Sequence, residues 1–126
     1  MVPSVTQSRP ETGQALRPYT TGRPEGEAKL IVGVSKITIR LPENDSLKGK
    51  RRVVSSLTTK VRNKFNVSIA EVGDNDVWQV ATLGVTCAAN EARHVEEVLG
   101  KVMDFIERSR DDFEVIAQEM ETLTGF

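Results

Sequence analysis

A run of cations without a single acid is the feature of this chain most able to do chemistry. Between residues 46 and 65 there is no Asp or Glu, and the basic residues are Lys48, Lys50, Arg51, Arg52, Lys60, Arg62 and Lys64. If the segment is one helix, at about 100° per residue, four of these cations lie beside or opposite its apolar face. Several cations on a rigid rod, together with Ser and Thr hydroxyls, suit contact with a phosphate backbone. The pattern therefore predicts nucleic-acid binding through Lys48, Arg51, Arg52 and Arg62.

Two other interpretations of the cationic run stay open. The run can be a solvated helix face whose cations pair with residues 89–126, which hold ten acids against four bases. It can also contact an acidic protein partner. Because the whole chain has a net charge of only −1, the distribution of charge is more informative about a partner than the total.

Trp78, the single tryptophan of the chain, is a second candidate contact. Alternation predicts a strand over residues 78–88 with Trp78 and Val80 on the face opposite Leu83. Stacking of Trp78 on an unpaired base is possible chemistry, but the aromatic pattern of RRM domains and the GxxG loop of KH domains are both absent. We expect Trp78 and Val80 to pack against the hairpin or a second subunit. A homodimer through this sheet face, without a nucleic-acid ligand, is therefore the alternative function.

The sequence lacks the patterns typical of catalytic and metal sites. His94 and Cys87 are the only residues of their types, so they cannot supply a zinc ligand set. A single residue of each type also does not favour a catalytic nucleophile–base pair. The segment 73–76 resembles part of a calcium loop but lacks the bidentate Glu that should follow. No Gly-rich phosphate loop occurs. We therefore expect a binding module rather than an enzyme, with no metal and no cofactor. A small-molecule sensor site on the sheet face is a third option, for which no ligand is indicated.

Hydrophobic periodicity predicts the elements that position these side chains. Residues 30–41 indicate a strand that stops at Pro42. Its apolar residues change parity near Ser35, so either a bulge lies there or the first half of the strand is buried on both faces. Ser46 is the expected N-cap of the basic helix, and Asn66 its C-terminal cap. The core face of that helix consists of Val54, Leu57, Val61 and Phe65.

The second half of the chain completes the predicted fold. Strands over residues 67–72 and 78–88 are close enough to form a hairpin, and Asn90 caps a second helix with the core stripe Val95, Val98, Leu99, Val102, Phe105 and Ile106. Residues 113–123 have helical apolar spacing, yet the first strand needs an edge partner, so we predict a strand over 113–117. The βαββαβ order predicts an α+β, ferredoxin-like fold: a four-stranded antiparallel sheet with two helices on one face and the other face open.

Composition divides the chain into an arm and a domain. Residues 1–28 hold four of the five prolines and show no apolar periodicity, which predicts a disordered N-terminal arm. Residues 29–126 are the expected single domain. A lone cysteine excludes an intramolecular disulfide and fits a reducing compartment, and no apolar run is long enough to span a bilayer. The expected location is the cytoplasm.

A series of short motifs, in order along the chain, resembles one known family. The motifs are Leu41-Pro42, Ser46-Leu47-Lys48, Lys50-Arg51-Arg52-Val53, Phe65-Asn66-Val67-Ser68-Ile69-Ala70-Glu71-Val72, Asp76, Trp78-Gln79 and Leu83-Gly84-Val85. Over residues 30–121 the chain is similar to the YlxP family, small bacterial proteins classed as a domain of unknown function. The resemblance implies a ferredoxin-like fold. Genes of that family often lie near genes for transcription elongation and translation initiation, which implies RNA or the ribosome as a partner. The chain departs from the family at Gly49, where Asp or Glu is typical.

Overall fold

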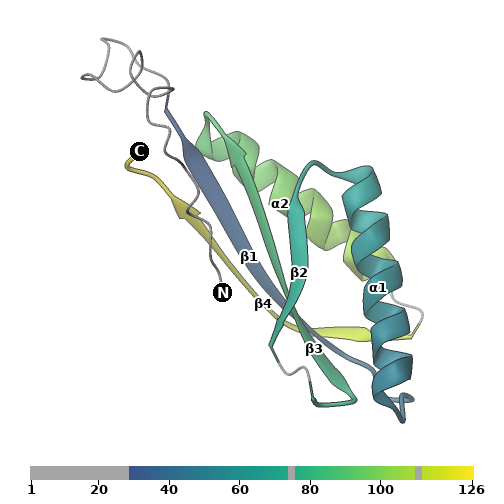
Figure 1. Ribbon diagram of the computed structural model, residues 1–126. Coiled ribbons are helices and arrows are strands. Elements are labelled where there is room, and N and C mark those ends of the chain that lie inside the picture. Colours follow the sequence, from purple (N-terminus) through teal and green to yellow (C-terminus); the bar gives the residue numbers. More distant parts are fainter. Residues whose placement is uncertain (1–28, 74–75, 110–111) are drawn as a thin grey trace, which may run out of the picture.

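A computed structural model describes residues 29–73, 76–109 and 112–126, which form one sheet and two helices (Figure 1). The predicted N-terminal arm, residues 1–28, lies outside the described residues. The elements in chain order are β1 (Ile31–Arg40), α1 (Leu47–Lys64), β2 (Ser68–Gly73), β3 (Val80–Ala89), α2 (Ala92–Arg108) and β4 (Glu114–Leu123).

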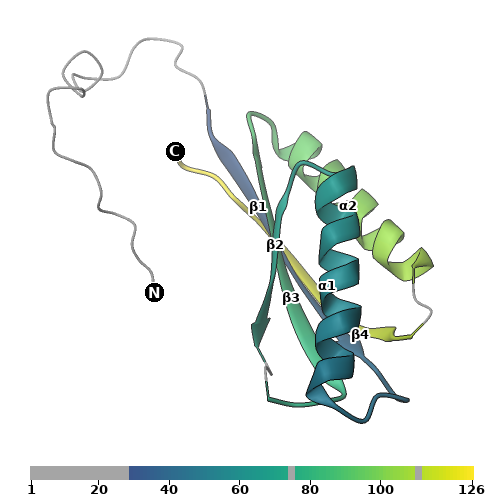
Figure 2. The same cartoon turned by 45° about the vertical axis from the view of Figure 1, so that its right-hand side comes forward.

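The four strands form an antiparallel sheet in the order β2-β3-β1-β4. Both helices lie on one face of this sheet, and the other face carries no helix of the described chain (Figure 2). The predicted α+β, ferredoxin-like βαββαβ fold is confirmed.

The parity change in β1 is not caused by a bulge at Ser35. Pairing of β1 with β3 runs without interruption from Ile31 opposite Ala89 to Arg40 opposite Val80. Every odd-numbered residue of β1 is buried under the helices, while Val32 and Val34 are half-buried on the open face. The irregularity lies instead between β1 and β4, where the register shifts after Thr38.

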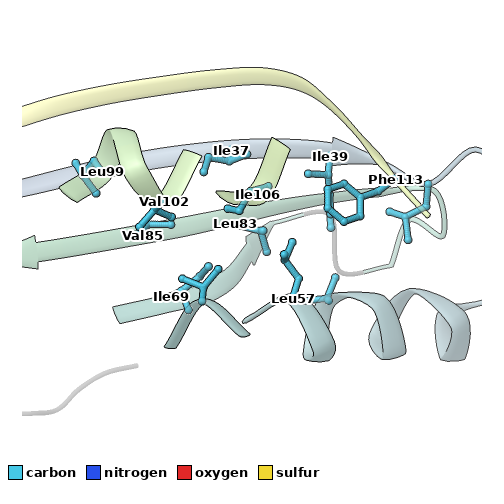
Figure 3. Close-up of a cluster of buried hydrophobic side chains, with 14 of the residues drawn as sticks. Ile37, Ile39, Leu57, Ile69, Leu83, Val85, Leu99, Val102, Ile106 and Phe113 are labelled. Carbon is cyan, nitrogen blue, oxygen red and sulfur yellow. The ribbon is translucent and has the colours of Figure 1, made fainter. Parts of the chain in front are cut away.

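The core fills the space between the sheet and the two helices, as Figure 3 shows for side chains of β1, β2, β3 and both helices and for Phe113, which precedes β4. The buried residues of α1 include Val54, Leu57 and Val61, and those of α2 are Val95, Leu99, Val102 and Ile106. The predicted core residues Phe65, Val98 and Phe105 are only partly buried. The rings of Phe65 and Phe105 meet edge to face at 5.7 Å between centroids. They close the margin of the core where the two helices meet.

The N-terminal end of α1 confirms Ser46 as the N-cap. The Ser46 hydroxyl accepts a hydrogen bond from the Gly49 backbone at 2.9 Å. The structure also explains the glycine: a Cβ at position 49 would lie 2.2 Å from the Asn44 side-chain oxygen. Asn44 is held there because its amide donates to the carbonyls of Ser46 at 2.7 Å and Trp78 at 2.6 Å. Gly49 therefore makes room for a clamp between the helix start and the β2–β3 connection.

Several predicted boundaries are wrong, among them two helix caps and the start of β3. The C-cap of α1 is Phe65 rather than Asn66, and its backbone N–H donates to the Val61 carbonyl at 2.8 Å. The N-cap of α2 is Glu91 rather than Asn90, without a capping bond from its side chain. The strand β3 begins at Val80, two residues after Trp78.

The ambiguous last segment is a strand, so its helical alternative is wrong. It begins one residue later than predicted and extends further, to Leu123, because it pairs with β1 over almost the whole length of both strands. The register shift partly explains why the apolar residues of this strand do not alternate. Val115 pairs with Ile39 and Ala117 with Thr38, so Ile116 is an extra residue in β4.

Candidate nucleic-acid interface

The predicted phosphate contacts all lie on the outer side of α1. Lys48, Arg51, Arg52 and Arg62 are exposed, whereas the opposite side of the helix is buried against the sheet. At about 1.5 Å of rise per residue, these cations extend over about 21 Å of the helix axis. Ser55 and Thr59 are exposed among them. The helix therefore presents a row of cations and hydroxyls to solvent.

The row is not neutralised by the protein's own carboxylates within the described residues. Their ion pairs are Arg40 with Glu114 and Lys50 with Glu71, and neither involves an exposed cation of α1. The expectation that the acidic residues 89–126 pair with this helix is therefore not met in residues 89–109 and 112–126. Six of the seven cations that the sequence analysis counted are exposed on α1 and pair with no described acid: Lys48, Arg51, Arg52, Lys60, Arg62 and Lys64.

Two of the six cations are partly engaged by the fold. A guanidinium nitrogen of Arg62 donates to the Ile69 carbonyl of β2 at 3.3 Å. The Lys64 ammonium lies over the rings of Phe65 and Phe105, at 5.9 and 5.8 Å from their centroids. Lys48, Arg51 and Arg52 are clustered in the first two turns, while Arg62 stands about 15 Å further along the axis.

Lys50 belongs to the cationic run but not to this surface. Its side chain is 1% exposed, and its ammonium lies 3.0 Å from the Glu71 carboxylate. The same nitrogen donates to the carbonyls of Val77 at 2.7 Å and Val80 at 3.1 Å. The sequence analysis counted Lys50 with the other cations and did not predict its burial. Helical periodicity could have indicated it, because at about 100° per residue position 50 falls on the same side of the helix as Leu57 and Val61. Lys50 fixes α1 to the β2–β3 hairpin.

Trp78 lies in the turn between β2 and β3 and not in the sheet. It is 51% exposed, and its carbonyl accepts the Asn44 amide. The strand prediction failed here because the carbonyls of Val77 and Trp78 are taken by Lys50 and Asn44 instead of by a neighbouring strand. Val80 opens β3 opposite Arg40 and is half-buried on the open face. The structure thus separates the two residues predicted to share a sheet face.

The two residues dismissed as metal ligands lie beside one cleft. Cys87 and His94 both line a hollow between the C-terminal end of α1 and α2. Burial raises the pKa of the Cys87 thiol above its ordinary value, an effect partly opposed by a hydrogen bond from the Gly33 backbone. Across the described part of the chain, no group of three or more His, Cys, Asp or Glu side chains is placed to hold a metal ion. Nor does any described helix have the length and apolar character needed to cross a membrane.

Comparison with known proteins identifies relatives of this chain. The family model described as "Protein of unknown function (DUF503)" matches residues 32–120, which run from β1 into β4. The uncharacterized protein YlxP of Bacillus subtilis (strain 168) is 35% identical over 77 residues, which cover 61% of this chain and 84% of that protein. The residues matched by the family model include all of α1 and its exposed cations.

Proposed function

This chain belongs to the DUF503 family, and we propose that it is a small cytoplasmic binding protein, not an enzyme, that contacts RNA along the outer side of α1. One observation carries the proposal: apart from the buried Lys50, the cations of α1 are exposed and no described carboxylate pairs with them. Unpaired surface cations on a rigid helix release counterions from a nucleic acid when they replace them at the phosphates.

The contact chemistry follows from the side chains. The guanidinium groups of Arg51 and Arg52 can each donate two parallel hydrogen bonds to one phosphate, and Lys48 adds a point charge beside them. Arg62 extends the same row toward the C-terminal end of the helix. Because phosphate contacts carry no base information, such a surface suits RNA of defined shape, such as ribosomal RNA, rather than a short sequence motif.

Filter binding to ribosomal RNA fragments tests the proposal. At about 50 mM salt the wild-type protein should bind, and at about 200 mM binding should weaken strongly. The double variant Arg51→Glu/Arg52→Glu should bind at least tenfold more weakly, about 1.4 kcal/mol. A matched reversal elsewhere, Lys36→Glu/Arg93→Glu, changes two exposed cations of β1 and α2 and should leave the affinity within about twofold. No binding by the wild type at low salt, or equal losses in both variants, would disprove the proposal.

A homo-oligomeric interaction module is the second candidate, supported by the open sheet face. Val72 and Leu123 are 56% and 37% exposed. Leu123 pairs with the half-buried Val32 at one end of the open face, Val72 lies against Gly84 near its middle, and Val80 is at the other end opposite Arg40. Exposed apolar side chains on one sheet face can form a contact surface. Sedimentation should then give a mass that rises with concentration, and Val80→Glu should return the protein to a monomer. A monomer at all concentrations would exclude this candidate.

A further inference from the structure

A cleft distinct from the RNA-facing side of α1 lies between the C-terminal end of that helix, the end of β3 and the first half of α2. Figure 2 shows the last turns of α1 beside α2 on the same face of the sheet. The cleft has a volume of about 320 Å³, and Lys64, Phe65, Cys87, His94, Val98 and Lys101 are among the residues that line it. This volume is at the lower end of the range for small-molecule pockets.

The charged side chains that line this cleft are cationic, and Asn66 adds a neutral amide. Lys64 and Lys101 contribute ammonium groups, His94 contributes ring nitrogens, and no carboxylate of the described residues lines the cleft. Three other clefts on the described surface differ in this respect, because each includes at least one acid: Asp112, Glu91 and Glu119, respectively. A hollow with two ammonium groups and no acid favours an anion over a cation or a neutral ligand.

Apolar side chains form part of the remaining wall. Phe65 packs edge to face against Phe105, and Val98 is a half-buried residue of α2. The Lys64 ammonium is located near both rings by cation–π contacts at 5.9 and 5.8 Å. An apolar wall beside the positioned Lys64 ammonium group resembles small-molecule sites, in which a few polar groups orient a ligand against mostly apolar side chains.

We propose that this cleft binds a small organic anion no larger than a mononucleotide, with its phosphate or carboxylate group at Lys64 and Lys101 and its apolar body against Phe65 and Val98. His94 can donate an additional hydrogen bond from its ring. None of Lys48, Arg51, Arg52 and Arg62 lines the cleft, so this site is independent of the RNA contact and does not require it.

Cys87 provides the assay, since it is the only cysteine of the chain and lies in the cleft wall. The rate of its alkylation by N-ethylmaleimide is followed by intact mass on the full chain at about pH 8, where part of even a raised-pKa thiol is ionised. The probes are AMP, inorganic phosphate and benzoate, with adenosine as the uncharged control. Titration calorimetry with the same probes measures binding without relying on the thiol.

We expect AMP or benzoate at about 5 mM to slow alkylation at least threefold and to give a saturable heat with a Kd at or below about 1 mM, while adenosine does neither. AMP and benzoate also separate phosphate from carboxylate recognition.

The double variant Lys64→Gln/Lys101→Gln should abolish the protection of Cys87 from alkylation. Two controls should retain it: Lys60→Gln/Arg93→Gln, which neutralises two exposed cations outside the cleft, and Arg51→Glu/Arg52→Glu. Absence of both protection and heat with every anion, or protection that survives the Lys64/Lys101 substitutions, would overturn the proposal.

Discussion

At the scale of single residues, Lys50 shows that a cation in a basic run can be part of the core. Burying an ammonium group costs several kcal/mol unless a charge and hydrogen-bond acceptors replace its water. Glu71, Val77 and Val80 supply these partners. The next residue along the chain, Arg51, is exposed, because a rotation of about 100° carries it to the side of the helix. Adjacent cations in this run therefore have different roles.

Replacement of Lys50 by Met is expected to lower the free energy of unfolding by about 3 kcal/mol, since it leaves the Glu71 carboxylate and two carbonyls without their cation. Urea denaturation measures the loss. Glu71→Leu in the Lys50→Met background should recover part of it, giving a coupling energy of about 1 kcal/mol or more. Arg51→Met, at an exposed position, should change stability by no more than about 0.5 kcal/mol. If Lys50→Met and Arg51→Met are equally mild, Lys50 does not hold the hairpin.

At the scale of the elements, the position of α2 on the sheet depends on Gly33. This residue lies on the helix-facing side of β1 and is buried. A Cβ there would lie 2.1 Å from a methyl carbon of Val95 and 2.8 Å from one of Leu99. These distances are far below van der Waals contact, so the glycine lets the helix approach the strand closely.

Gly33→Ala should therefore destabilise the protein by about 1–3 kcal/mol through overpacking. In a thermal melt this corresponds to a fall in Tm of several degrees, at about 4–8 °C per kcal/mol for a domain of this size. Gly100→Ala is the matched control: it lies within α2, a Cβ there meets nothing within 4 Å, and the change should stabilise by about 0.5–1 kcal/mol. The double variant Gly33→Ala/Val95→Ala shortens the opposing side chain and should relieve the overlap. It should still be less stable than the wild type, because the buried methyl groups of Val95 are lost. A neutral Gly33→Ala would show that α2 can shift without cost.

Local periodicity was sufficient to predict most of these elements, and long-range contacts explain where it failed. The sequence predicts most of the core faces of both helices and the β2–β3 hairpin because the buried apolar residues follow the repeat of their own element. The start of β3 was misplaced because Lys50 and Asn44, distant in sequence, take the carbonyls before Val80. Residues 114–123 form a strand because β1 offers an edge, which outweighs their local preference. The anion cleft combines residues from α1, β3 and α2, so no spacing along the chain could indicate it.

At the scale of the whole molecule, positive and negative charge are separated along the fold. The exposed cations of α1 come from one element, while α2 and β4 together hold seven acids against three bases. An approaching polyanion is attracted to the outer side of α1 and repelled by β4, which carries three acids and no base. This field would orient RNA along the outer side of α1. The four phosphate contacts proposed for this row are few, so we expect a modest affinity that depends strongly on salt.

The number of phosphate contacts can be read from the salt dependence of binding. For a single-stranded RNA, the logarithm of the binding constant falls with the logarithm of salt concentration by about 0.7 per contact. Lys48, Arg51, Arg52 and Arg62 therefore predict a slope of about −3. Arg51→Glu/Arg52→Glu should reduce the magnitude of the slope by about half, whereas Lys36→Glu/Arg93→Glu should not change it. Filter binding at four or five salt concentrations gives these values.

Oligomerisation through the open sheet face would change the slope in a recognisable way. That face lies opposite the helices (Figure 1), so a dimer formed there would carry two cationic rows on opposite sides of the particle. One RNA strand long enough to reach both rows would give a slope nearer −6, while a short oligonucleotide would still give about −3. Sedimentation at the protein concentrations used for binding identifies the species present. A slope near zero with any RNA would mean that the exposed cations of α1 do not contact phosphate, whatever the oligomeric state.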